Sequence, residues 1–168
     1  IILLFFLIYF MQANFFAWFN IGGIMPNLFV LLVLFIGLFV GNKIGAIFGI
    51  LFGMILDIVI GRIVGPSSVL LGIVGMLGEY FDKNFSKDSK ITLLLMEACS
   101  LLIYEIGMYA FRIIQYGIEI EILTFTLTLI VEIVFNILLT IIFYPAIKKL
   151  GYYMEESFKG KKILTRYF

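Results

Sequence analysis

The chain has 168 residues, of which 63% are hydrophobic and 14% charged, and its mean hydropathy is +1.16. Soluble domains are about 45–50% apolar and about 25% charged, so this composition excludes a soluble globular protein and requires the apolar excess to face lipid. The absence of histidine and the single cysteine, Cys99, exclude disulfide frameworks, thiolate or imidazole zinc sites and histidine-dependent catalytic triads.

Continuous apolar runs follow one another along the chain, and about 20 such residues cross a bilayer core of roughly 30 Å. We expect six membrane helices, at residues 1–18, 26–41, 44–60, 66–81, 91–114 and 122–147. The runs do not alternate with polar residues, which favours helices over an outer-membrane barrel. Because the middle three runs are short, five spans is the alternative. The predicted fold class is an all-α polytopic membrane bundle.

The N-terminal run reads as a first helix rather than a signal peptide, because it lacks a basic n-region and a clear cleavage site. The numbering begins at Ile1 rather than Met, so we expect the natural start to precede it. Six helices with a cytoplasmic start place ten Lys and Arg residues inside and two, Arg62 and Arg112, outside. The ten are Lys43, Lys83, Lys87, Lys90, Lys148, Lys149, Lys159, Lys161, Lys162 and Arg166. Both termini are therefore expected in the cytoplasm.

We expect a single transmembrane bundle at residues 1–147 and a basic cytoplasmic tail at 148–168. Pro145 should end or kink the last helix. Cations near anionic lipid contribute roughly 1 kcal/mol each, so the tail is expected to lie along the inner leaflet. A topology determinant and a docking site for a cytoplasmic partner both remain open for this tail.

Glycine recurs at every fourth position through the second and third expected helices. The row consists of Gly37, Gly41, Gly45, Gly49, Gly53, Asp57, Gly61 and Gly65. Its members Gly45, Gly49, Gly53 and Asp57, here called the glycine ridge, share one face of a helix, where small residues permit close backbone approach. The span at 26–41 is the expected intramolecular partner, a partner protein is the alternative, and Gly72, Gly75 and Gly78 add a second thin surface. We expect Asp57 to be reached by Arg62 or to contact a partner or ligand.

Residues 26–78 resemble the MreD family of bacterial rod shape-determining membrane proteins. The resemblance rests on Pro26 opening the second span, on the glycine ridge ending in Asp57, and on Gly61, Gly65 and Gly75. Chain length, span number and the short basic tail also agree. The family often has an acid after the opening proline, where this sequence has Asn27.

This resemblance implies a non-enzymatic member of the cell-elongation complex in the bacterial inner membrane. The partners it implies are an MreC-like bitopic protein, a RodA-like glycosyltransferase, a class B penicillin-binding protein and the MreB filament. It also implies a fold similar to the six-helix substrate-binding subunits of energy-coupling-factor vitamin transporters. A vitamin-binding transporter subunit is accordingly the alternative function.

Polar residues recur in the last two expected helices. The sixth span carries a stripe at steps of four, Thr124, Thr128, Glu132, Asn136, Thr140 and Tyr144, and the fifth carries Glu97, Glu105 and Arg112. Since lipid cannot satisfy such groups, the stripe should face other helices or a cavity. We expect Glu105 or Glu132 to be protonated or linked to water, and we favour a structural use of these acids over proton coupling.

Other chemistry is absent from the sequence. It contains no phosphate-binding loop, no G-x-S-x-G elbow and no cluster of soft metal ligands, so we expect no enzyme activity, no cofactor and no metal. No basic and aromatic face outside the tail suits nucleic acid. The candidate helix-packing or partner-binding residues are Gly45, Gly49, Gly53, Asp57, Glu97, Glu105, Arg112, Glu132 and Asn136.

Overall fold

The computed structural model describes residues 1–60, 63–85 and 87–159, and these ranges contain helices and no β-strand. The elements are α1 (Ile2–Phe10), the π-helical η1 (Met11–Phe15), α2 (Phe16–Trp18), α3 (Leu28–Phe39), α4 (Asn42–Val59), α5 (Pro66–Asn84), α6 (Lys90–Tyr116) and α7 (Ile122–Lys159). The predicted all-α fold is confirmed.

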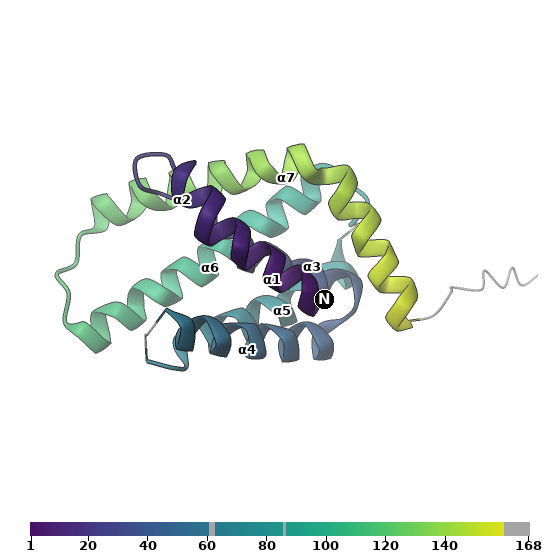
Figure 1. Ribbon diagram of the computed structural model, residues 1–168, viewed down its shortest axis with the longest axis horizontal. Coiled ribbons are helices and arrows are strands. Elements are labelled where there is room, and N and C mark those ends of the chain that lie inside the picture. The colour runs from purple at the N-terminus through teal and green to yellow at the C-terminus, as the bar shows by residue number, and fades with distance from the viewer. Residues whose placement is uncertain (61–62, 86, 160–168) are drawn as a thin grey trace, which may run out of the picture.

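The helices run back and forth between two ends of the molecule (Figure 1). The N-terminus and the last turns of α7 lie at one end, here called the terminal end, and the 117–121 connection lies at the other, the distal end. Two helical stretches of the described chain, Lys90–Tyr116 and Ile122–Phe158, are long and apolar enough to cross a membrane, while Ile2–Trp18 and Leu28–Phe39 are apolar but shorter. The count of six crossings stays a prediction.

Helix α3 forms the centre of the bundle, and every residue from 29 to 39 is buried. It packs against α1, α4, α5, α6 and α7. At 1.5 Å per residue its 12 residues span about 18 Å, and a helix that is apolar on all sides is stable only when it is surrounded.

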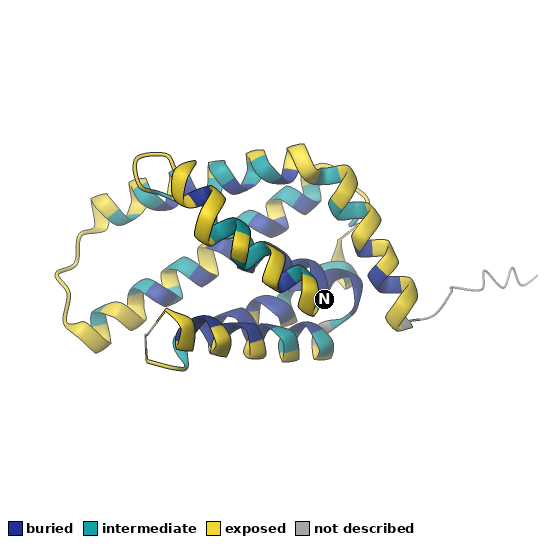
Figure 2. Cartoon of the chain, in the orientation of Figure 1, coloured by how far each residue is buried: buried dark blue, intermediate teal, exposed yellow. Residues whose placement is uncertain are grey.

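The outer faces of the other helices are exposed (Figure 2), and many of the residues exposed there are large and apolar. Leu3, Ile114 and Leu123 are 86%, 85% and 76% exposed. In water such a surface would be unfavourable over its whole extent, so its natural surroundings are lipid chains.

Helix α7 does not end at Pro145, and the expected division into a bundle at 1–147 and a tail at 148–168 stays a prediction. The helix continues to Lys159 and is bent (Figure 1), as an internal proline requires when it removes a backbone hydrogen bond. The part after the bend packs on the bundle, where Gly151 lies against the ring of Phe39. The expected tail residues Lys161, Lys162 and Arg166 lie outside the described residues.

Candidate functional site

The glycine ridge lies inside the bundle and faces α5. A Cβ atom added at Gly49 would overlap the backbone carbonyl of Leu71, and one added at Gly53 would overlap the backbone of Ser67 and Ser68. At Gly45 the added atom would lie 2.6 Å from the Cα of Gly37 on α3. The expected partner, the span at 26–41, therefore touches only one end of the ridge, and α5 covers the rest.

Helix α5 makes this possible because it also lacks side-chain bulk on two faces. A Cβ atom at Gly75 would overlap the carbonyl of Gly45 on α4, and one at Gly78 would lie 2.5 Å from the backbone nitrogen of Leu38 on α3. Three helices thus meet at backbone contact, and the chain's own segments account for Gly37, Gly45, Gly49 and Gly53 of the row.

Asp57, at the end of the ridge, is 1% exposed and stabilises the turn into α5. Its Oδ2 accepts a hydrogen bond of 2.9 Å from the backbone N–H of Gly65, whose φ of +142° suits glycine. Its Oδ1 has no hydrogen-bond partner among the described residues. The expected pairing with Arg62 lies outside the described residues.

In the middle of the bundle, the two long helices α6 and α7 meet through polar side chains. Glu97 and Ser100 on α6 and Asn136 and Thr140 on α7 are all fully buried. The hydroxyl of Thr140 donates to Oε1 of Glu97 over 2.9 Å, and the amide of Asn136 donates to the backbone carbonyl of Glu132 over 3.0 Å. This half of the expected stripe fixes one helix against the other.

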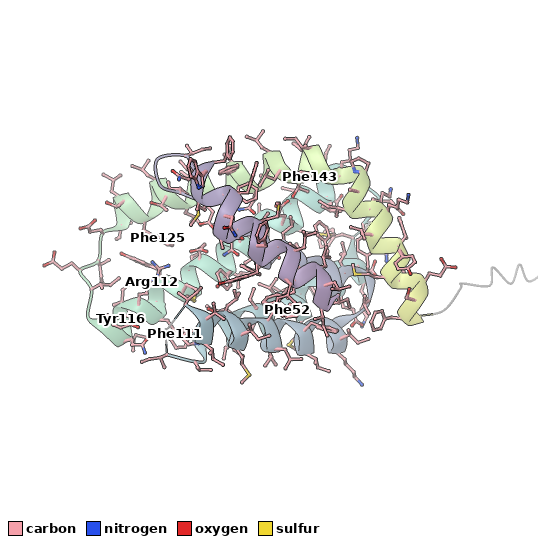
Figure 3. The ribbon with its side chains drawn as sticks, viewed as in Figure 1. Phe52, Phe111, Arg112, Tyr116, Phe125 and Phe143 are labelled. Atoms are coloured by element: carbon pink, nitrogen blue, oxygen red, sulfur yellow. The ribbon has the colours of Figure 1, made fainter. Side chains whose placement is uncertain are left out.

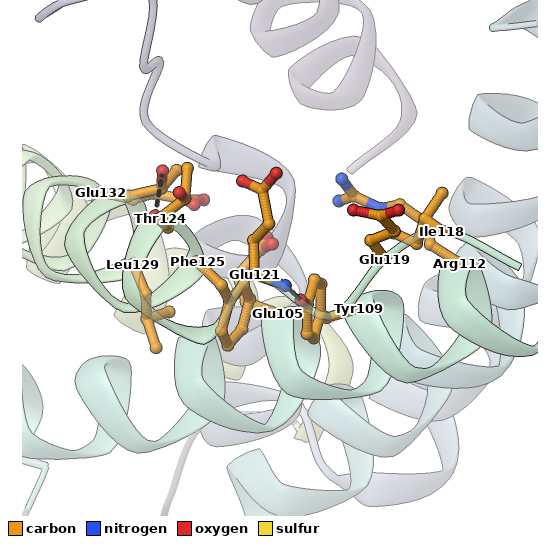
Figure 4. Close-up of a pocket in the computed structure, with 11 residues that line it drawn as sticks. Glu105, Tyr109, Arg112, Ile118, Glu119, Glu121, Thr124, Phe125, Leu129 and Glu132 are labelled. Carbon is orange, nitrogen blue, oxygen red and sulfur yellow. Dashed lines mark hydrogen bonds between the residues drawn. The ribbon is translucent and has the colours of Figure 1, made fainter.

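Nearer the distal end, α6 and α7 separate and two cavities open beside them. One of about 370 Å³ lies between α6, the 117–121 connection and α7 (Figure 4), and one of about 610 Å³ extends to η1 and the start of α3. Glu105, Arg112, Thr128 and Glu132 line both cavities. We call the space around these four residues the distal cleft.

Aromatic and polar contacts shape the distal cleft. The rings of Tyr109 and Phe125 stack at 4.2 Å across its wall, and the Tyr109 hydroxyl accepts a hydrogen bond of 2.9 Å from the backbone N–H of Glu121. Arg112 and Phe125 lie in the space between the two helices (Figure 3). Glu132 is only 8% exposed although it borders both cavities.

Two residues of this region were not among the candidates. The amide of Asn27 donates to Oε1 of Glu105 over 3.2 Å, while its Oδ1 accepts from the backbone N–H of Val30 as the N-cap of α3. Gln12 donates to the carbonyl of Pro26 over 2.7 Å and accepts from the N–H of Leu28 over 3.2 Å. A glutamine within an apolar run was the signal that could have identified Gln12, since buried polar groups need partners.

The site brings together part of the predicted set. Glu105, Arg112 and Glu132 meet in the distal cleft, Glu97 and Asn136 lie one or more turns deeper, and the glycine ridge faces α5 in the other half of the bundle. Among the described residues, no group of three or more His, Cys, Asp or Glu could hold a metal ion.

Comparisons with known proteins give one match. Neither the curated proteins nor the solved structures contain a match to the chain. The family described as rod shape-determining protein MreD matches residues 1–152, which include every residue of the distal cleft. The chain belongs to the MreD family of rod shape-determining proteins.

Proposed function

We propose that this chain is a non-enzymatic scaffold of the bacterial rod-shape machinery, crossing the inner membrane six times with both termini in the cytoplasm. In this role it holds an MreC-like bitopic protein and, with it, a RodA-like glycosyltransferase, a class B penicillin-binding protein and the MreB filament. The family match over residues 1–152 carries the proposal.

The architecture supports a scaffold that acts through contacts between helices. The N-terminus and the last described turns of α7 lie toward the same end of the bundle, as an even number of crossings requires (Figure 1). Described lysines concentrate at that end, at Lys43, Lys83, Lys87, Lys90, Lys148 and Lys149, in agreement with a cytoplasmic orientation.

Co-purification from native membranes tests the proposal. A tagged copy of the full chain, solubilised in mild detergent, should retain the MreC-like protein of the same cell, while an unrelated polytopic protein with the same tag should not. If the tagged chain carries none of the named partners in a preparation where it remains folded, the scaffold function is wrong.

The cavity of about 610 Å³ favours a second candidate, a small-molecule-binding transporter subunit. Its volume falls within the roughly 300–1,000 Å³ of ligand sites, and Gln12, Asn27 and Glu105 supply polar groups to its wall. Native mass spectrometry of the purified protein distinguishes the candidates. A bound vitamin-sized molecule that Glu105→Gln removes would favour the transporter, and its absence would favour the scaffold.

A further inference from the structure

Four polar side chains are completely buried where α6 and α7 meet in the middle of the bundle. They are Glu97, Ser100, Asn136 and Thr140, each with an exposed fraction of 0%, and we call them the central polar cluster. The two cavities of the distal cleft are not lined by any of the four. The cluster is therefore a separate feature, which neither the packing of glycines nor the distal cleft explains.

The register of α6 against α7 brings the four residues to one place. The two helices run in opposite directions (Figure 1), and the hydroxyl of Thr140 donates to Oε1 of Glu97 over 2.9 Å. Ser100 lies about one turn from Glu97 toward the distal end, and Asn136 lies about one turn from Thr140 in the same direction. Ser100 and Asn136 thus lie at the same level, beside the bond that joins the two helices.

Three oxygen atoms of the central polar cluster have no hydrogen-bond partner among the described residues. They are Oε2 of Glu97, Oγ of Ser100 and Oδ1 of Asn136. The amide nitrogen of Asn136 already donates to the backbone carbonyl of Glu132, so its oxygen remains as an acceptor. Buried polar groups in native proteins are paired with protein, water or an ion, and three unpaired oxygens within about one helix turn indicate a shared ligand.

No charge within the described residues balances a carboxylate at position 97. None of the ion pairs among those residues involves Glu97. Helix α3, which packs against both α6 and α7, carries apolar side chains and one glycine along its whole length. An ionised group inside a membrane bundle requires a countercharge or a proton, so the ligand is expected to bring positive charge.

A proton, a water molecule and a cation meet these requirements to different degrees. A proton on Glu97 removes the charge but leaves the Ser100 hydroxyl unpaired, because that hydroxyl forms no hydrogen bond with either acceptor. A water molecule bridges the oxygens but leaves the carboxylate charged. A cation does both, since hard cations bind carboxylate, hydroxyl and amide oxygens.

We propose that a sodium ion binds between α6 and α7, coordinated by Oε2 of Glu97, Oγ of Ser100 and Oδ1 of Asn136. One carboxylate balances one positive charge, which favours a monovalent ion over Ca²⁺, whose sites use several carboxylates. The expectation of no metal rested on the lack of soft ligands, whereas this site uses hard oxygens. The ion joins the two long helices on the terminal side of the distal cleft, whether the chain is a scaffold or a transporter subunit.

Thermal unfolding of the purified full chain tests the proposal. The melting temperature is measured by circular dichroism while NaCl is replaced by choline chloride at constant ionic strength and pH. At a Na⁺ concentration of about 100 times the Kd, linkage predicts a melting temperature about 5–10 °C higher than in choline. Retention of radioactive sodium by the same preparation measures the binding directly.

Substitutions locate the ion. Glu97→Gln, which keeps the shape and removes the charge, and Asn136→Leu, which removes the oxygen, should abolish the response to Na⁺. Ser100→Ala should raise the half-saturating Na⁺ concentration about tenfold or more, and it serves if the other variants do not fold. The controls are Glu156→Gln and Thr126→Val, exposed positions on α7 that should leave the response unchanged.

Two results would overturn the inference. A melting temperature that is the same in Na⁺ and in choline, whether or not it changes with pH, means that a proton or water occupies the central polar cluster. A response to Na⁺ that persists in folded Glu97→Gln, Asn136→Leu and Ser100→Ala variants means that the ion binds elsewhere in the chain.

Discussion

In the half of the bundle made by α3, α4 and α5, glycines bring helix backbones into contact, whereas at the distal end of α6 and α7 polar side chains line two cavities beside these helices. The first half buries apolar residues around α3, and its buried polar side chains, Asp57, Ser67 and Ser68, lie where α4 and α5 meet. The second buries Glu97, Asn136 and Thr140 and keeps Glu132 at a cavity wall.

This difference separates a rigid part from a receptive one. Helices at backbone contact cannot approach further or slide without overlap, so the glycine ridge fixes α4 and α5 as one unit. Helices held apart by side chains leave room for another chain. Under the proposed scaffold function, the first part would keep the bundle rigid and the second would contact a partner.

The largest expected effect comes from adding bulk to the rigid half. Gly49→Leu should prevent folding, because even the Cβ of the leucine would overlap the backbone of Leu71. Gly49→Ala should lower the free energy of unfolding by about 3 kcal/mol, the upper part of the usual range for overpacking. Detergent-mixture unfolding followed by circular dichroism measures the loss.

Gly107→Ala on α6 is the matched control for that prediction. Its added Cβ would meet only side-chain atoms of Leu70, which can rotate away, and alanine gains up to about 1 kcal/mol of helix propensity over glycine. An equal loss of stability in Gly107→Ala and Gly49→Ala would remove the distinction between the two halves.

A smaller effect is expected at the contact that joins the halves. Lys87 pairs with Asp82 at 3.0 Å and with Glu155 on α7 at 3.2 Å, and the side chains of Lys87 and Glu155 are only 11% and 12% exposed. Lys87→Met leaves two acids without this cation and should cost about 1–2 kcal/mol, less than for a fully buried pair because water still reaches the site.

Lys83→Met is its control. Lys83 pairs with Glu79 one turn away, but its side chain is 68% exposed, so the loss should stay below about 0.5 kcal/mol. Similar losses in both variants, measured by the same unfolding assay, would show that Lys87 does not hold α7 to the core.

The polar contact within the second half should contribute less. Hydrogen bonds between membrane helices average about 0.6 kcal/mol and reach about 1.7 kcal/mol, and Thr140→Val leaves Glu97 without its donor in a fully buried position. A double-mutant cycle of Thr140→Val with Glu97→Gln should therefore give a coupling of about 1 kcal/mol in the free energy of unfolding.

Thr126→Val is the control. It removes an exposed hydrogen bond to the backbone carbonyl of Ile122 and should change the free energy of unfolding by less than about 0.5 kcal/mol.

Much of the fold could be predicted because each continuous apolar run directly indicates a helix. The expected spans 1–18 and 91–114 fall almost entirely within helices, while α7 continues beyond 147 because its last turns pack on Phe39 and Lys87, a tertiary contact that no local pattern contains. The proline was a correct signal for a bend but not for an end.

The site was harder to predict for a geometric reason. Spacing placed Glu105 and Arg112 on one face of α6 and Thr128 and Glu132 on one face of α7, but whether two such faces touch or enclose a cavity depends on how far apart the helices lie. The prediction that the span at 26–41 covers the glycine ridge was correct only at Gly45 for the same reason, since α3 and α5 both carry small residues and the sequence does not show which helix lies closer.

The smallest expected effect concerns the loop that holds α7 at the terminal end. Asp88 accepts hydrogen bonds from the Tyr152 hydroxyl and from Lys148, and these bonds, that of Tyr152 foremost, lower the pKa of Asp88 below its ordinary value of 3.8. Because the pKa of Asp88 is lowered in the folded state, the stabilisation is complete at a pH above the pKa of the unfolded chain and disappears as the pH falls through the pKa of the folded protein.

Asp88 is exposed, so this contact contributes at most about 1 kcal/mol to the free energy of unfolding. The difference in melting temperature between the unsubstituted chain and Asp88→Asn should be constant from pH 5 to 7 and should shrink below about pH 4. A difference that instead grows on acidification would mean that this contact does not hold the loop to α7.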